Sequence, residues 1–208
     1  MFRRSFVLAL LVIAVAIPQA FAETRKVLVL GDSIAAGFGL PVSEALPAKL
    51  EAKLRAEGHD VRVINAGVSG DTTAAGLARL DWVLGGKPDF AVVQLGANDM
   101  LRGLSPAETR KNLDIILTQL DKASVPTLLV GMKAGRNLGA DYAKSFDGVF
   151  PDLAKTHNIE LYPFLLDGIA LDPRLNQGDG IHPNERGVAV LVDRLTPYVV
   201  RLLQRSKG

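Results

Sequence analysis

"RKVLVLGDSIAAGFG", residues 25–39, joins an apolar run to a loop of small residues. Runs this rich in valine and leucine are typical of buried parallel strands, so we expect the first strand over 26–31. Four similar runs follow, at 61–65, 90–96, 126–132 and 159–164. Helical patterns separate them, at 44–57, 72–84, 106–122, 141–156 and 184–204. The alternation predicts an α/β fold with a five-stranded parallel sheet of flavodoxin-like order and helices on both faces.

The order of strands and loops indicates where a functional site would lie. Open α/β sheets bind their ligands just outside the carboxyl ends of the strands. The residues that follow each predicted strand are therefore the candidates for chemistry. They occupy the segments GDS (31–33), NAGVSGDTT (65–73), GAND (96–99), KAGRNLG (133–139) and GDGIHP (178–183).

The first 22 residues have the layout of a secretory signal peptide. Arg3 and Arg4 precede an apolar stretch that ends in the small-residue pattern AFA. The apolar stretch is too short for a comfortable membrane span. We therefore expect cleavage after Ala22, one domain over 23–208, no stable membrane insertion after cleavage, and a periplasmic or secreted protein. An uncleaved N-terminal anchor is the alternative, and RRSFV faintly resembles a twin-arginine export signal.

The composition excludes several classes of protein. Removal of the first 22 residues takes two arginines and no acids from 24 basic and 22 acidic side chains, which leaves 22 of each. A neutral chain without a basic run argues against binding to nucleic acid. The sequence has no cysteine, which excludes a cysteine nucleophile, thiolate metal sites and disulfides. We expect neither a metal nor a cofactor.

The glycines of the first loop do not fit a phosphate-binding motif. A P-loop requires G-x-x-x-x-G-K-[ST], which the chain lacks. A dinucleotide-binding loop requires G-x-G-x-x-G, and Gly31, Gly37 and Gly39 have a different spacing. The remaining interpretation is a turn that presents Ser33 as a nucleophile.

A nucleophilic serine needs a base within hydrogen-bond reach, and the chain has three histidines. His59 and His157 precede predicted strands, so we expect them at the opposite edge of the sheet as ordinary exposed residues. His182 follows the last strand, and Asp179 stands three residues before it. In a turn that enters a helix, this spacing lets the carboxylate hold the imidazole Nδ1–H and leaves Nε2 as the base. The alternative is that Asp179 only caps the helix.

Acyl transfer to a serine also needs donors for the oxyanion that develops on the attacked group. Three candidates follow the first three strands, namely the N–H of Ser33, the N–H of Gly70 and the side-chain amide of Asn98. Glycine at position 70 lets the backbone approach closely. The alternative for Asn98 is a turn residue that bonds its own backbone. The neighbouring polar residues are expected to shape turns or to cap a helix: Asp32 and Asp99 for turns, Asp71 and Thr72 for the cap.

Together these residues resemble the GDSL, or SGNH, hydrolases. The matching segments are LGDSIAAG, SGDTT, LGANDMLRG and DGIHP, and the similarity covers essentially all of the chain after the signal segment. The resemblance is strongest to bacterial periplasmic multifunctional esterases, which act as thioesterase, lysophospholipase and arylesterase. It implies a three-layer α/β/α sandwich with a five-stranded parallel sheet. It also implies catalytic roles for Ser33, Gly70, Asn98 and His182, with Asp179 completing a triad.

Two departures limit what the resemblance implies about substrate. Ala97 stands where such esterases often carry glycine, which alters the loop beside Asn98 without removing the donor. The loop 133–139 differs from the expected substrate loop, so a preference for acyl-chain length does not carry over. Four apolar residues would line an acyl groove or serve ordinary packing: Met100, Leu101, Leu104 and Leu138.

The expected function is that of an exported serine hydrolase that cleaves acyl esters through an acyl-enzyme, with thioesters as a further substrate class. A small-molecule ester or a lipid is the expected partner, and we expect a monomer. Two other interpretations stay open. A carbohydrate O-deacetylase of the same family would favour more aromatic surface than Trp82 and three tyrosines offer. A non-catalytic exported binding protein on the same fold is the other.

Overall fold

The computed structural model describes residues 24–205, so the expected signal peptide at 1–22 lies outside the described residues. Its centre is one parallel sheet of five strands in the order β2-β1-β3-β4-β5. The bounds are β1 Arg25–Gly31, β2 Val61–Gly67, β3 Phe90–Gln94, β4 Thr127–Val130 and β5 Glu160–Tyr162. This is the flavodoxin-like order that the sequence predicts. Gly31, the last residue of β1, pairs with Gly67 on one side and Gln94 on the other. The carboxyl ends of the three strands therefore lie side by side.

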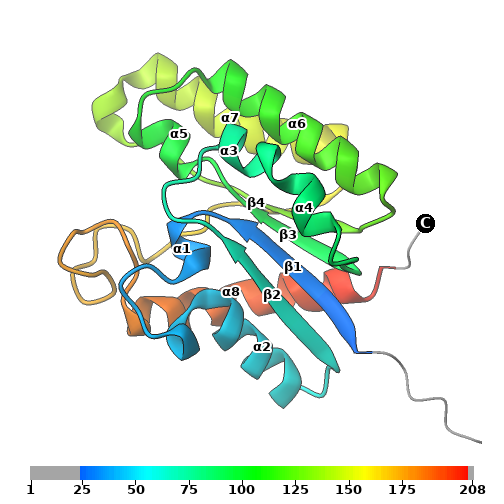
Figure 1. Ribbon diagram of the computed structural model, residues 1–208. Coiled ribbons are helices and arrows are strands. Elements are labelled where there is room, and N and C mark those ends of the chain that lie inside the picture. Colours follow the sequence, from blue (N-terminus) through cyan, green and yellow to red (C-terminus); the bar gives the residue numbers. More distant parts are fainter. Residues whose placement is uncertain (1–23, 206–208) are drawn as a thin grey trace, which may run out of the picture.

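Helices cover both faces of the sheet and complete three layers, as expected (Figure 1). In Figure 1, α2 and α8 lie against one face, and α3, α4, α6 and α7 lie against the other. The helix bounds are α1 Ser33–Ala36, α2 Leu46–Ala56, α3 Thr73–Ala78, α4 Leu80–Leu84, α5 Ala97–Leu101, α6 Pro106–Lys122, α7 Ala140–Thr156 and α8 Glu185–Leu203. Two 3₁₀ turns, Val42–Glu44 and Arg136–Leu138, lie in the loops.

The described helices differ from the predicted ones at three places. The helix expected over 72–84 is broken at Arg79 into α3 and α4. The side chain of Arg79 turns back to the carboxyl end of β1, where Nη2 donates to the Gly31 carbonyl at 3.0 Å. The helices α1 and α5 were not predicted, because four or five residues are too few to show a helical period.

The core explains why the strands are apolar on both faces. Val27, Leu28, Val29 and Leu30 of β1 are each no more than 1% exposed. Burial of a valine or leucine side chain stabilises a fold by about 1.5–3 kcal/mol, so the central strands anchor the molecule. Among residues 24–205, no helix has both the length and the apolar character needed to cross a membrane.

Candidate active site

Ser33 is the first residue of α1, separated from the end of β1 by Asp32 alone. The side chain of Asp32 caps this helix, since Oδ1 accepts from the Ile34 N–H at 3.0 Å. The helix lies tightly on the end of β2, because a Cβ at Gly67 would be 2.2 Å from the Ala36 nitrogen. A glycine at position 67 and an aspartate at position 32 therefore hold Ser33 at the carboxyl edge of the sheet.

His182 comes back to Ser33 from the far end of the chain. It lies in the loop between β5 and α8, drawn in orange beside the blue α1 in Figure 1. The Nε2 atom of His182 is 2.9 Å from Ser33 Oγ, and its Nδ1 is 2.6 Å from Asp179 Oδ2. The three side chains form one hydrogen-bonded chain, the arrangement that a serine, a base and an orienting acid would require.

Asp179 is held by its own loop and does not cap α8. Its Oδ1 accepts from the backbone N–H of Ile181 at 2.9 Å and of His182 at 3.0 Å. Hydrogen bonds from the backbone and the ring of His182 are the main causes that lower the pKa of Asp179 to about 2. The cap of α8 is Asn184, so the interpretation of Asp179 as a helix cap is wrong. The carboxylate is ionised and oriented toward the imidazole.

The three candidate oxyanion donors follow the carboxyl ends of β1, β2 and β3. Within residues 24–205, the N–H groups of Ser33 and Gly70 donate to no other protein group. Gly70 has a φ of +87°, a conformation that other residues rarely adopt. The Asn98 amide donates one N–H to the Asp71 carbonyl at 3.0 Å. It bonds another loop and not its own turn, so the turn interpretation is wrong. Its second N–H donates to no group in residues 24–205.

The loops that carry Gly70 and Asn98 are tied together by buried polar groups. Asp99 is 2% exposed and accepts from the N–H of Thr73 at 2.8 Å and from its hydroxyl at 2.5 Å. Asp99 therefore joins α5 to the start of α3, which goes beyond the turn-shaping role expected for it. Asp71 pairs with Arg79 at 2.7 Å, and Thr72 alone caps α3. The expected cap at Asp71 is wrong, because its partner is an arginine eight residues away.

The sequence from Val29 to Val190 matches the model of the GDSL-like lipase/acylhydrolase family. This is well over half of the chain, and it includes every residue of the site described above. The chain belongs to this family. The resemblance and the fold class expected from the sequence are both confirmed.

Individual relatives in the family are esterases by name. The chain is 39% identical to Esterase TesA of Pseudomonas aeruginosa, over 89% of this chain and 92% of that protein. It is 37% identical to thioesterase 1/protease 1/lysophospholipase L1 of Escherichia coli K12, over 89% of this chain and 88% of that protein. Among solved structures, the SGNH-hydrolase family esterase AlinE4 is 50% identical and covers 88% of this chain and 99% of its own, with a TM-score of 0.74. The expectation of an ester hydrolase is confirmed.

The GDSL site of this chain has exposed apolar side chains beside Asn98. Leu101 is 52% exposed and Leu104 is 40% exposed. Met100 is partly buried and packs against the core, and Leu138 is half-buried in the 3₁₀ turn Arg136–Leu138. The structure thus presents two of the four predicted groove residues openly.

The other two histidines lie away from the GDSL site. His59 and His157 precede β2 and β5, at the opposite edge of the sheet, as expected. The expectation that both are exposed is wrong. His59 is of intermediate exposure. The side chain of His157 is only 15% exposed, and its Nε2 is 2.7 Å from Asp114 Oδ1. The cause is the packing of α7 against α6, which carries Asp114.

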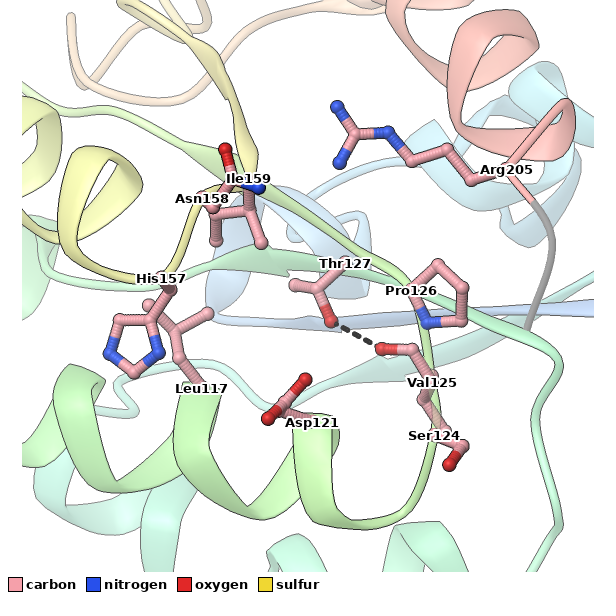
Figure 2. Close-up of a pocket in the computed structure, with 10 residues that line it drawn as sticks. All are labelled: Leu117, Asp121, Ser124, Val125, Pro126, Thr127, His157, Asn158, Ile159 and Arg205. Carbon is pink, nitrogen blue, oxygen red and sulfur yellow. Dashed lines mark hydrogen bonds between the residues drawn. The ribbon is translucent and has the colours of Figure 1, made fainter. Parts of the chain in front are cut away.

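A cavity of about 350 Å³ opens next to His157 (Figure 2). Turn residues before β4 and β5 form much of its wall, and Thr127 Oγ1 there donates to the Val125 carbonyl at 2.9 Å. The Nε2 atom of His157 at the edge of this cavity is the one paired with Asp114. Within residues 24–205, no group of three or more histidine or acidic side chains is placed to hold a metal ion.

Sequence reasoning missed the arginines that join the strand-end loops. Arg102 Nη2 donates to the Gly70 carbonyl at 2.7 Å, and Arg79 bonds both Asp71 and Gly31. These contacts span 8 to 48 residues of sequence, so no local spacing indicates them. Arg102 does lie in the family segment LGANDMLRG, which was the one available signal.

Asp32 is a fully buried carboxyl directly before the serine. Its Oδ1 accepts from Ile34 N–H and from Gln94 Nε2, both at 3.0 Å. Its Oδ2 has no hydrogen-bond partner in the part of the chain that the structure describes. Burial, the largest cause, raises the pKa of Asp32 to about 6. The folded protein therefore binds this proton more tightly than the unfolded chain, whose aspartate has the ordinary value of 3.8.

Replacing Asp32 with asparagine will flatten the dependence of stability on pH. In the natural protein, the tighter binding of the Asp32 proton stabilises the fold, and this stabilisation is fully present below pH 3.8. It is lost as the pH rises through 6, and the loss in the free energy of unfolding is about 3 kcal/mol. Asparagine does not titrate and still caps α1. Urea unfolding from pH 3.5 to 7.5 will show the free energy of unfolding of Asp32→Asn rising relative to that of the natural protein. Parallel curves for the two proteins would contradict the assignment.

Proposed function

We propose that this chain is an exported serine esterase in which Ser33 is the nucleophile, His182 the base and Asp179 the residue that orients the base. The observation that carries the proposal is the 2.9 Å separation of Ser33 Oγ and His182 Nε2. A serine hydroxyl becomes an effective nucleophile when a base within hydrogen-bond reach can take its proton. The ionised Asp179 supports this role, because it keeps the Nδ1 proton in place and leaves Nε2 free to accept.

The first half of the proposed reaction makes an acyl-enzyme. His182 Nε2 takes the proton of Ser33 as Oγ attacks the acyl carbonyl carbon, and the oxyanion accepts hydrogen bonds from Ser33 N–H, Gly70 N–H and Asn98. The bond between the acyl carbon and the leaving oxygen or sulfur then breaks. The leaving group takes the proton from His182 and departs as an alcohol or a thiol.

The second half of the proposed reaction releases the acid. A water molecule gives its proton to His182 Nε2 and attacks the ester carbon on Ser33. When the tetrahedral intermediate collapses, Ser33 Oγ leaves and takes back the proton from His182. The carboxylic acid is released and the enzyme returns to its starting state. No step needs a metal ion or a cofactor.

Replacing Asn98 with alanine will lower kcat by roughly 10²–10³, the range for the loss of one oxyanion donor. The expected KM stays nearly constant, because the hydrogen bond is made to charge that develops only in the transition state. Steady-state hydrolysis of a p-nitrophenyl ester measures both constants. Asn112→Ala is a matched control, since its amide bonds Thr73 at 3.1 Å behind the site. A rise in KM with unchanged kcat would count against the role of Asn98.

The proposed substrates are acyl esters of small alcohols and of lysophospholipids, with thioesters as a further class. The names of the relatives from Pseudomonas aeruginosa and Escherichia coli support these classes. The exposed Leu101 and Leu104 beside the oxyanion donors favour an apolar acyl chain. The signal-peptide layout of residues 1–22 supports export, which would bring the enzyme to lipids rather than to cytosolic acyl-CoA.

A fluorophosphonate probe followed by peptide mapping tests the nucleophile. The expected result is a single covalent label at Ser33, and no labelling would favour a non-catalytic binding protein. A panel of p-nitrophenyl esters of rising chain length, with lysophospholipid, acyl-CoA and acetylated sugar beside it, tests the substrate class. Turnover confined to the acetylated sugar would favour the carbohydrate deacetylase instead.

A further inference from the structure

The serine and the histidine of the site belong to segments almost 150 residues apart in sequence. Within residues 24–205, two side-chain hydrogen bonds join residues 32–41 to the loop 163–184. One is the bond between Ser33 and His182 itself. The other comes from Gln177, whose Nε2 donates to the Phe38 carbonyl at 2.7 Å. Gln177 is therefore the side-chain link that does not take part in proton transfer.

Gln177 also holds the part of the loop that carries His182. Its Nε2 donates a second bond to the Pro183 carbonyl at 3.1 Å, and its backbone N–H donates to the His182 carbonyl at 2.8 Å. Gln177 thus holds the backbone carbonyls of both His182 and the residue that follows it. Both N–H groups of the Gln177 amide are used, one for each segment.

The segment after Ser33 is shaped to receive this amide. Gly39 has a φ of +74°, and a Cβ there would be 2.2 Å from Gln177 Oε1. The ring of Phe38 lies against the ring of His182 with centroids 4.6 Å apart. The carbonyl that Gln177 binds and the ring that touches the imidazole belong to the same residue, so the link sets the position of both.

We propose that Gln177 is a positioning residue that fixes His182 relative to Ser33 through Phe38, an inference that rests on the proposed function. A shift of the imidazole by about 1 Å costs a reaction up to 10²-fold. Loss of the Gln177 side chain leaves the Ser33–His182 bond itself intact but removes its support. The expected consequence is a lower kcat with little change in KM, because Gln177 acts through His182 and not on the substrate.

The neighbouring residue provides a matched control. Asn176 is 6% exposed, and its Nδ2 donates to the carbonyls of Ile169 at 2.6 Å and Asp172 at 2.8 Å. Its amide bonds therefore stay within the loop 163–184 and do not reach the serine segment. Asn176→Ala removes structural bonds of the same type from the same loop and leaves the link to Phe38 in place.

The test compares Gln177→Ala and Asn176→Ala by kinetics and by thermal unfolding. Gln177→Ala is expected to lower kcat by about ten-fold and to lower Tm only slightly, because its side chain is half-buried. Asn176→Ala is expected to lower Tm more and kcat less. A kcat loss that follows Tm loss in the same proportion for both variants would overturn the proposal, since Gln177 would then be merely structural.

Proton NMR of the imidazoles gives a readout that does not depend on turnover. The chain has three histidines, so their ring signals are few and can be assigned. In Gln177→Ala the His182 signal should move toward its position in Phe38→Leu, while the His59 and His157 signals stay in place. An unmoved His182 signal would overturn the proposal even if kcat fell.

The same measurements separate this proposal from the proposed function. If Ser33→Ala abolishes turnover and Gln177→Ala keeps normal kcat, the function stands and the positioning role of Gln177 is wrong. If Ser33→Ala retains normal turnover, the proposed nucleophile is wrong and the kinetic role of Gln177 falls with it. A combined loss in the Gln177→Ala, Phe38→Leu double variant that is smaller than the product of the single losses would support a shared pathway.

Discussion

Ester turnover will fall by at least 10⁴-fold when Ser33 is replaced by alanine, on the order of losses seen when a catalytic serine is removed. The change deletes the Oγ atom that lies 2.9 Å from His182 Nε2, and no other hydroxyl takes its place in the hydrogen-bonded chain. The fold will persist, because α1 is capped by Asp32 and not by Ser33. Hydrolysis of p-nitrophenyl butyrate, with circular dichroism and thermal unfolding beside it, measures both effects.

Ser43 provides the control for this experiment. It is exposed in the 3₁₀ turn Val42–Glu44, outside the chain of hydrogen bonds at the site. Ser43→Ala should keep normal turnover and normal labelling by a fluorophosphonate, whereas Ser33→Ala should lose both. If Ser33→Ala keeps a normal rate in a folded protein, another residue is the nucleophile and the proposed mechanism is wrong.

The sheet could be predicted from the sequence because its signals are local and strong. Each strand is an apolar run with a turn after it, and the observed strands overlap all five predicted runs. The order of the strands follows from the alternation with helices, which permits few topologies. Short helices carry no such signal. The helix α1 exists because Asp32 supplies a cap at its start and because Gly67 lets it pack on β2, and periodicity cannot reveal either contact.

At the site, too, contacts between residues close in sequence could be predicted, and contacts between distant residues could not. Asp179 and His182 could be paired from sequence because three residues separate them in one turn. The loop that carries them meets Ser33 because both follow carboxyl ends of parallel strands. By contrast, Asp71 with Arg79 and Asp99 with Thr73 are side-chain pairs between separate elements, set by helix orientation after folding. Gln177 and Phe38 are 139 residues apart, so their contact leaves no trace in local spacing.

Asp179→Asn will lower kcat by about 10³–10⁴ while the loop keeps its shape. Asparagine retains a carbonyl oxygen that accepts from the Ile181 and His182 N–H groups. Its amide nitrogen, however, would face His182 Nδ1 as a donor. The imidazole would then carry its proton on Nε2 and could no longer accept one from Ser33, which is the known consequence of such a change in a serine–histidine–aspartate triad.

Asp172 is the matched control for this variant. It lies in the same loop, and hydrogen bonds from Arg174 lower its pKa to about 2, as the contacts with His182 do for Asp179. Both carboxylates are therefore ionised across an assay range of pH 5 to 9, so each variant removes one negative charge. Asp172→Asn removes the same charge from the same loop but touches neither His182 nor Ser33. If the two variants lose activity equally, the charge of the loop matters and orientation of the imidazole by Asp179 does not. If only Asp179→Asn loses activity and both variants keep a Tm close to that of the natural protein, the loss comes from the changed tautomer of His182.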